Sequence, residues 1–243
     1  MAIRCFAVTD RGLGRPSNQD AAYVGSAPGA EVLAVADGMG GAPAGDRASA
    51  LVIAAFERAP GAGEPPERYL RDAVERGRLA VEGELEMHPE RAGMGSTVVA
   101  ALVRGREAWI AHVGDSRAYL WRDGDLRRLT EDHSAAAEAV RGGRLDPLAA
   151  RASPLRHVLT RVVGGGGRGG AGSEPEVAGP LALDGNSALL LVSDGVCEVL
   201  NDEQVGAVLA AYRGPGAARA LVERVHAAGA PDNIGIALLD ERA

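Results

Sequence analysis

The stretch Glu31-Val-Leu-Ala-Val-Ala-Asp37-Gly38 is an apolar run that ends on an aspartate and a glycine. Short apolar runs with turn residues at their ends are typical of buried strands. The same pattern recurs at Trp109–Asp115 and at Ala188–Asp194, whereas Asp232 stands at the start of a run that continues to Leu239. An aspartate in such a place lies at the rim of a sheet, on stiff backbone. The sequence therefore predicts several carboxylates along the rim of a β structure.

Carboxylates that gather at one rim repel one another unless a cation lies among them. Hard divalent ions are the simplest such cations, because they prefer oxygen ligands. We therefore expect Mg²⁺ or Mn²⁺ chemistry at Asp37, Asp115, Asp194 and Asp232.

Asp-Gly is also the strongest hairpin dipeptide, so two further copies have a simpler interpretation. Asp123-Gly124 and Asp184-Gly185 each lie in a polar junction between two strand-like runs. We interpret both as plain turns. After Asp37 and Asp194, by contrast, the chain leads towards helical segments, which separates these two aspartates from ordinary hairpins.

Composition limits the fold and the function. The 243 residues suit one large domain, and a hydrophobic share of 46% is enough for a sizeable core. A net charge of −7 argues against a nucleic-acid partner. No apolar run reaches the roughly 18 residues of a membrane span, and the first residues do not resemble a signal peptide. With Cys5 and Cys197 interpreted as free thiols, these features predict a cytoplasmic protein.

Hydrophobic periodicity predicts strands in groups and helices in pairs, which favours an α+β layered fold over alternating βαβ units. Helical spacing of apolar residues is clearest in Gly45–Arg58 and Pro66–Met87. Two more helices are expected at Asp202–Tyr212 and Ala217–Ala228. Strands are expected at Ile3–Val8, Ala21–Val24, Val32–Ala36, Thr97–Val103, Ala108–Val113 and Ala118–Trp121. No linker divides the chain, so we expect one domain over residues 1–243, with a weakly periodic segment at 132–157.

Eight short motifs follow one another along the chain. They are Arg15-Pro-Ser-Asn18-Gln-Asp20, Asp37-Gly-Met-Gly-Gly41, Met94-Gly-Ser-Thr97, Gly114-Asp-Ser-Arg117, Leu129-Thr-Glu-Asp-His-Ser134, Leu159-Thr-Arg161, Ser193-Asp-Gly195 and Asp232-Asn233. In this order they resemble the bacterial branch of the metal-dependent PP2C-type (PPM) protein serine/threonine phosphatases. The resemblance covers nearly the whole chain. It implies a four-layer αββα sandwich, in which two antiparallel β-sheets are flanked by helix pairs.

The resemblance also implies a set of metal ligands. Asp37 would bridge two tightly bound Mn²⁺ or Mg²⁺ ions, and the carbonyl of Gly38 would bind the second ion. Asp194 and Asp232 would complete the shell of the first ion. Asp115 would help to hold a third, more weakly bound ion.

A phosphate ligand and its supports follow from the first and last motifs. Arg15 would clamp the phosphate, because a planar guanidinium matches two phosphate oxygens. A surface salt bridge is the other interpretation of Arg15. Asn18, Asp20 and Asn233 would order the rim behind the metal ligands.

The implied activity is hydrolysis of phosphoserine and phosphothreonine monoesters in proteins by a metal-activated water. Residues 132–157 would form a flap beside the site, with His133, Arg141 and Arg144 as candidate substrate contacts. For His133 we favour the other interpretation, a structural or solvated loop histidine. The expected partners are phosphorylated proteins, with a cognate serine/threonine kinase implied by the resemblance. We expect a monomer with neither a nucleic-acid nor a membrane partner.

Two other functions stay open. A pseudophosphatase, which binds phosphoproteins without turnover, is suggested by Gln19 and Ala42, where the bacterial pattern often has Glu and His. A two-metal phosphodiesterase or nuclease is the second, although the acidic charge and the lack of a basic stripe count against it. Assays with a monoester, a phosphopeptide and a diester separate these functions.

Overall fold

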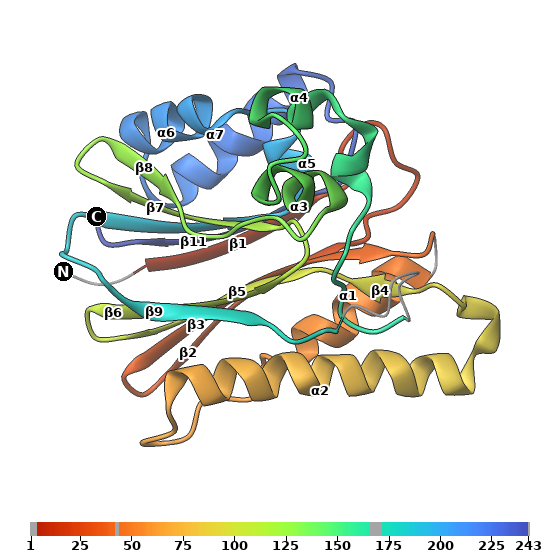
Figure 1. Ribbon diagram of the computed structural model, residues 1–243. Coiled ribbons are helices and arrows are strands. Elements are labelled where there is room, and N and C mark those ends of the chain that lie inside the picture. Colours follow the sequence, from red (N-terminus) through yellow and green to blue (C-terminus); the bar gives the residue numbers. More distant parts are fainter. Residues whose placement is uncertain (1–3, 42–43, 166–171, 243) are drawn as a thin grey trace.

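Two antiparallel sheets stacked between pairs of helices form the molecule, whose computed structural model describes residues 4–41, 44–165 and 172–242 (Figure 1). One sheet has the order β1 (Arg4–Asp10), β11 (Ile234–Asp240), β10 (Ser187–Val192), β7 (Arg117–Arg122) and β8 (Asp125–Arg128). The other has the order β2 (Asp20–Ala27), β3 (Ala30–Met39), β5 (Val98–Arg104), β6 (Glu107–Val113) and β9 (Glu176–Ala182). The short strand β4 (Gly95–Ser96) pairs with the end of β3.

Helices cover the outer face of each sheet (Figure 1). The second sheet packs on α1 (Ala44–Ala54) and α2 (Pro66–Met87), and the first packs on α6 (Asp202–Ala211) and α7 (Gly214–Ala227). Buried side chains such as Leu33 and Leu189 fill the space between the sheets. The αββα sandwich implied by the resemblance is therefore confirmed.

Most predicted elements form, and their ends shift by a few residues. The helix predicted at Pro66–Met87 has those bounds, because Leu70, Ala73 and Val74 all face the core. The helix that contains Gly45 ends earlier than predicted, at Ala54. Three strands lie outside the predicted set: the two-residue β4, and β8 and β9, which are largely exposed and stand out in the sequence only as strand-like runs beside the Asp-Gly turns.

The two Asp-Gly pairs interpreted as turns lie in turns. Asp123 has a φ of 50° and joins β7 to β8. Asp184 lies between β9 and β10, where its Oδ1 accepts a hydrogen bond from the N–H of Asn186 at 3.1 Å. Both fall where the hairpin dipeptide was expected to turn the chain.

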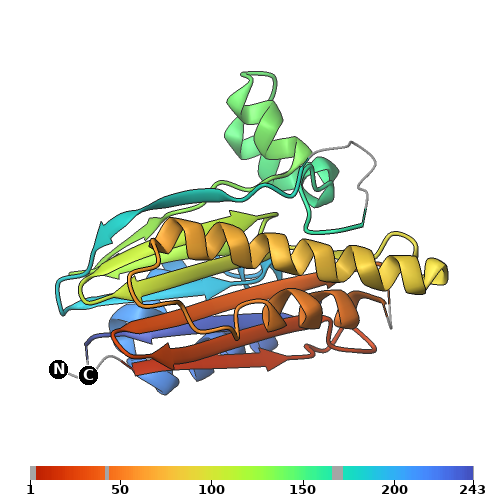
Figure 2. The same cartoon turned by 90° about the horizontal axis from the view of Figure 1, so that it is seen from below.

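A small helical subdomain projects from the sandwich (Figure 2). This flap consists of α3 (Ala135–Arg141), α4 (Pro147–Ala152) and the 3-10 turn η2 (Pro154–His157). Ser134 caps α3 by accepting a hydrogen bond from the N–H of Ala137 at 3.3 Å, and Asp146 caps α4 by accepting one from the N–H of Leu148 at 2.8 Å. The weak periodicity of 132–157 thus reflects short capped helices.

A buried ion pair lies at the end of β11 in the first sheet. Arg242 donates from Nε to Asp240 Oδ1 and from Nη2 to Asp240 Oδ2, both at 2.8 Å. Its guanidinium lies 4.2 Å from the ring centroid of Trp121. Burial alone would raise the pKa of Asp240, but hydrogen bonds from Arg242 and from the N–H of Gly214 hold it below its usual value.

Three remaining points of the sequence analysis concern membrane spans, the cysteines and the glycine-rich segment. Among the described residues, no helix is both long and apolar enough to cross a bilayer. Cys5 and Cys197 are free thiols, as expected, and both are partly buried. Ala42 and most of the glycine-rich segment at 164–172 lie outside the described residues.

Candidate metal and phosphate site

Strand register brings the predicted aspartates to one end of the sandwich. In the second sheet Asp20 pairs directly with Asp37. In the first sheet β10 and β11 are antiparallel, so Asp194, after β10, and Asp232, before β11, lie at the same edge. Asp115 lies in the link that passes from β6 in one sheet to β7 in the other. Five carboxylates from five segments of the chain therefore meet.

These carboxylates are electrostatically coupled. Burial raises the pKa of Asp37 well above its usual range, and repulsion from Asp194 and Asp20 raises it further. Burial and the charge of Asp194 also raise the pKa of Asp115. Burial is the main reason that the pKa values of Asp20 and Asp194 rise to about 7. A set of acids that resists ionisation favours a bound cation, and an all-oxygen donor set suits Mg²⁺ or Mn²⁺.

Close packing explains the glycines that follow two of the aspartates. A Cβ at Gly38 would lie 1.8 Å from the carbonyl oxygen of Gly45, and one at Gly195 would lie 1.9 Å from that of Asn233. Any larger residue would push the backbone apart at either place. The Asp-Gly pairs thus allow the backbone segments beneath Asp37 and Asp194 to touch their neighbours.

Asn233 ties the loop before β2 to the start of β11. Its Oδ1 accepts a hydrogen bond from the N–H of Gln19 at 2.9 Å. Its Nδ2 donates to the carbonyl oxygens of Arg11 at 2.8 Å and Ser17 at 2.9 Å. Asn233 therefore fixes the loop that carries Arg15 beside Asp232.

Asp20 links the two sheets behind the rim. Ser193 donates from Oγ to Asp20 Oδ2 at 2.6 Å, and the same Oγ accepts the N–H of Gly235 at 2.8 Å. Asn18 Oδ1 accepts the N–H of Asp20 at 3.1 Å. The sequence indicated Asp20 and Asn18, but Ser193 was noted only as part of a motif.

Hydroxyl groups hold the backbone of Asp37. Thr97 Oγ1 accepts the N–H of Asp37 at 3.1 Å, while Ser96 Oγ donates to the Asp37 carbonyl oxygen at 2.9 Å. Thr97 Oγ1 also lies 2.8 Å from Ser116 Oγ. None of the three was predicted as a site residue, although the motifs Met94-Gly-Ser-Thr97 and Gly114-Asp-Ser-Arg117 contain them.

Arg15 is both an ion-pair partner and a neighbour of the acids. Its Nη2 lies 2.6 Å from Asp232 Oδ2, and 53% of its side chain is exposed. The hydrogen bond with Asp232 raises the pKa of Arg15, and the charges of Asp194 and Asp37 act in the same direction. The guanidinium thus lies at the edge of the acid cluster and remains open to solvent.

His133 lies at the base of the flap and differs from the expectation of a substrate contact. Its side chain is 0% exposed. The backbone N–H of His133 donates to the carbonyl oxygen of Gly114 at 2.9 Å. The ring Nδ1 accepts a hydrogen bond from the backbone N–H of Gly114 at 3.0 Å. His133 therefore holds both backbone groups of the residue before Asp115, which supports the structural interpretation of this histidine.

A second group of metal-ligating side chains lies nearby, formed by His112, His133 and Glu176. The two rings stack with centroids 4.5 Å apart and planes at 15°, so the imidazoles lie face to face. His112 Nε2 faces the Glu131 carbonyl oxygen at 2.9 Å and must carry its proton. Since His133 Nδ1 accepts from Gly114, the proton of that neutral ring lies on Nε2, 3.1 Å from Glu176 Oε1. These tautomers indicate a packed pair of histidines rather than a metal site.

The flap arginines have different surroundings. Arg141 Nη1 lies 3.1 Å from Glu131 Oε2, so its charge is already paired. Arg144 is exposed, and no ion pair is recorded for it among the described residues. At the base of the flap, Arg117 holds both carboxylate oxygens of Asp132, at 3.0 and 2.8 Å. Substrate contact by Arg141 and Arg144 stays a prediction.

Residues 14–227 match the family model described as protein phosphatase 2C. The chain belongs to the protein phosphatase 2C family. The matched range contains Arg15, Asp37, Asp115 and Asp194, and Asp232 follows shortly after it.

Named members of the protein phosphatase 2C family resemble this chain in sequence. It is 36% identical over 243 residues to the serine/threonine protein phosphatase PstP of Mycobacterium tuberculosis. The aligned region covers 99% of this chain and 45% of PstP. The chain thus spans less than half of that relative's length. It is 30% identical over 247 residues to the serine/threonine phosphatase stp of Listeria welshimeri, covering 96% of this chain and 93% of the relative.

Solved structures agree with the fold. The M. tuberculosis phosphatase PstP/Ppp has a TM-score of 0.87 at 35% identity and covers 99% of each chain. The catalytic domain of PstP in complex with two manganese ions has a TM-score of 0.85 at 34% identity, covering 98% of this chain and 97% of that one. The S. agalactiae serine/threonine phosphatase has a TM-score of 0.88 at 27% identity, covering 98% and 99%.

Proposed function

We propose that this chain is a divalent-metal-dependent phosphatase that hydrolyses phosphoserine and phosphothreonine monoesters in proteins. One observation carries the proposal. Carboxylates from five segments meet at one end of the sandwich, and an exposed guanidinium, that of Arg15, borders them. An acidic cluster beside a cationic anchor suits a substrate that is bound through metal ions and a phosphate group. Family membership and the names of the relatives support this activity.

The donor set fits two Mn²⁺ or Mg²⁺ ions and a weaker third. Asp37, Gly38, Asp194 and Asp232 would hold the two tight ions, and Asp115 the third. Divalent ions supply charge neutralisation and activation of water at such a centre. A manganese complex has been solved for the catalytic domain of PstP, which supports manganese here.

The chain's own residues position and orient the reacting groups. Arg15 would bind two phosphate oxygens through its planar fork. Asn233 would keep the Arg15 loop in register with Asp232, and Ser96 and Thr97 would keep the Asp37 backbone fixed. Groups held in this way need little rearrangement when substrate binds.

The setting of the enzyme is also a proposal. We infer a cytoplasmic monomer that opposes a serine/threonine kinase. Two free thiols are typical of a reducing compartment. The described residues of one chain complete all three apolar cores, so the fold needs no second copy. Size-exclusion chromatography with light scattering would test the monomer.

The decisive experiment measures hydrolysis of p-nitrophenyl phosphate, a phosphothreonine peptide and bis-p-nitrophenyl phosphate, with Mn²⁺ and with EDTA. Mn²⁺-dependent cleavage of both monoesters, with little cleavage of the diester, is expected. Binding of the phosphopeptide without turnover would instead favour the pseudophosphatase that Gln19 suggested. Preferred cleavage of the diester would favour the phosphodiesterase.

A further inference from the structure

A cavity of about 700 Å³ opens from the acid cluster and runs beneath the flap. Asp115 and Asp194 line one part of it. The flap helices form one wall, and α5 (Asp194–Cys197) with the start of α6 forms the other. This volume lies in the range of about 300–1,000 Å³ that is usual for ligand pockets. The candidate catalytic end therefore continues into a groove large enough for part of a peptide.

Small apolar side chains from the flap create much of this space. The groove is lined on the flap side by Ala136, Ala137, Val140, Pro147 and Ala150, and on the other side by Val199. Alanine at three of these places leaves room that a larger residue would fill. An apolar side chain of a ligand could bury its surface there against the alanines.

The positive charges along the groove are mostly neutralised. Five arginines line it, and four have carboxylate partners: Arg117 and Arg128 with Asp132, Arg141 with Glu131, and Arg156 with Glu198. Arg151 is the exception among the described residues. An acidic side chain of a ligand would have to compete with these existing ion pairs, and an apolar side chain would not.

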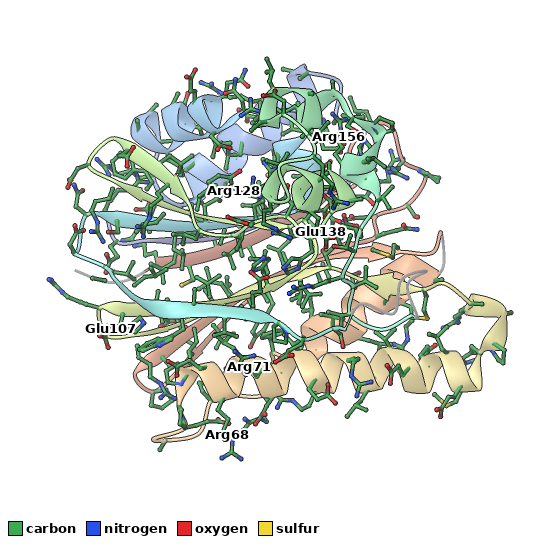
Figure 3. The ribbon with its side chains drawn as sticks, viewed as in Figure 1. Arg68, Arg71, Glu107, Arg128, Glu138 and Arg156 are labelled. Atoms are coloured by element: carbon green, nitrogen blue, oxygen red, sulfur yellow. The ribbon has the colours of Figure 1, made fainter. Side chains whose placement is uncertain are left out.

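Polar contacts with Glu198 also join the flap to the opposite wall. His157 Nδ1 lies 3.0 Å from Glu198 Oε1, and Arg156 Nε lies 3.8 Å from the same atom. Arg156 belongs to the flap itself, and Arg128 is the last residue of β8 (Figure 3). The two walls of the groove are thus already joined, which lowers the cost of ordering a ligand between them.

We propose that this groove binds the stretch of a phosphoprotein next to the phosphorylated residue and selects substrates that carry an apolar side chain there. The inference rests on the proposed function, because Asp115 and Asp194, two of the proposed metal ligands, also line the groove. Specificity would then come from the flap alanines, while Arg15 would recognise the phosphate in every substrate.

The test fills the groove at one position and uses the neighbouring residue as its control. Ala150 lines the groove, whereas Ala149 is exposed on the same helix and does not line it. The wild type, Ala150→Leu and Ala149→Leu are each loaded with Mn²⁺. Each is assayed on phosphothreonine peptides that carry leucine, serine or aspartate on both sides of the phosphothreonine.

The wild type should prefer the leucine peptide to the serine peptide by roughly tenfold in kcat/KM, as for an apolar side chain in a pocket. Ala150→Leu should lose that preference, and Ala149→Leu should keep it. Equal rates on the leucine and serine peptides in the wild type, or a preference for aspartate, would overturn the proposal. So would identical behaviour of the two variants.

Hydrolysis of p-nitrophenyl phosphate separates this proposal from the proposed function. That ester has no flanking peptide, so all three proteins should cleave it at the same rate. If none cleaves it with Mn²⁺, the proposed function fails. If all cleave it and the peptide preference is absent, only the groove proposal fails.

Discussion

Arg15 Nη2 lies 2.6 Å from Asp232 Oδ2, so the side chain proposed to bind phosphate touches one proposed to bind metal. An arginine in this place can exchange one oxygen anion for another, because carboxylate and phosphate present the same fork to a guanidinium. Occupation of Asp232 by a cation would weaken its attraction for Arg15. If the two proposed roles hold, the ion pair would couple metal binding at Asp232 to the availability of Arg15 for phosphate.

Replacing Arg15 by alanine should mainly raise KM, with some loss of kcat. The lost charge-assisted hydrogen bonds are worth roughly 1.5–3 kcal/mol, or about ten- to a hundredfold in kcat/KM. Lysine should rescue poorly, because its ammonium is a point charge. Steady-state kinetics on a phosphopeptide measure both constants. Values equal to those of the wild type for Arg15→Ala would exclude the role.

Replacing Asp37 by asparagine should abolish activity and sharply weaken Mn²⁺ binding, because the change removes the proposed bridge between the two ions. Calorimetric titration of the variant with Mn²⁺ measures the second effect without turnover. Asp123→Asn is the matched control, since Asp123 lies in a hairpin turn and outside the acid cluster. Unchanged Mn²⁺ binding in Asp37→Asn would contradict the assignment.

Replacing Asp115 by alanine should impair turnover while two Mn²⁺ ions still bind. Asp115 belongs to the acid cluster but comes from the link between the sheets, apart from the paired strand ends that carry the other aspartates. Calorimetry should show two tight ions in both wild type and variant. Loss of both tight ions in the variant would show that Asp115 belongs to the main pair instead.

Among the flap arginines, Arg151 should contribute more to phosphoprotein cleavage than Arg144. Arg151 lines the groove without a recorded acidic partner in the described part of the chain, whereas Arg144 does not line it. Exposed charge pairs are worth up to about 1 kcal/mol, so Arg151→Ser should lower kcat/KM at most about fivefold. The effect should shrink at high salt. An equal loss on p-nitrophenyl phosphate would indicate damage to the catalytic end.

Removing Arg242 should strongly destabilise the fold near neutral pH. Arg242→Met leaves the carboxylate of Asp240 buried without its cation, which costs about 3–5 kcal/mol. The pKa of Asp240 is lowered in the folded protein, so the stabilisation is complete above the unfolded value near 4 and is lost as the pH falls through the folded value. The difference in unfolding free energy between wild type and variant, measured by urea unfolding, should therefore become smaller below about pH 4.

Arg219→Met on the exposed face of α7 is the control for this prediction. Its effect should stay within about 0.5 kcal/mol, as for most surface changes, and should not vary with pH in this range. A gap for Arg242→Met that stayed constant down to pH 3 would mean that packing on Trp121, and not the charge pair, stabilises this end of the sheet.

Local patterns in the sequence carried much of the fold and the acid cluster. Apolar runs ending in aspartate predicted the strand ends, and helical spacing predicted α2 to the residue. The bounds of β8 and β9 escaped prediction because a partly exposed strand has no continuous apolar run to delimit it. Their place is decided by backbone pairing with β7 and β6, which no local pattern records.

Contacts between distant segments account for what the sequence did not reveal. The hydrogen bond from Ser193 to Asp20 joins residues 173 positions apart, and the burial of His133 depends on Gly114 and His112. The groove beneath the flap depends on how far the fold places α3 and α4 from α5, across the cavity that all three line. Residue types alone cannot state such distances, so Arg141 and Arg144 were grouped although only Arg141 lines the groove.

Strand β11 occupies an interior position in its sheet, between β1 and β10, although it is the last strand of the fold. During synthesis, β1 and β10 therefore leave the ribosome before the strand that pairs with both of them. Asp232 directly precedes β11, so the complete acid cluster cannot form on a nascent chain that lacks this strand. The proposed metal site therefore gains its full set of carboxylates only when β11 has taken its place between β1 and β10.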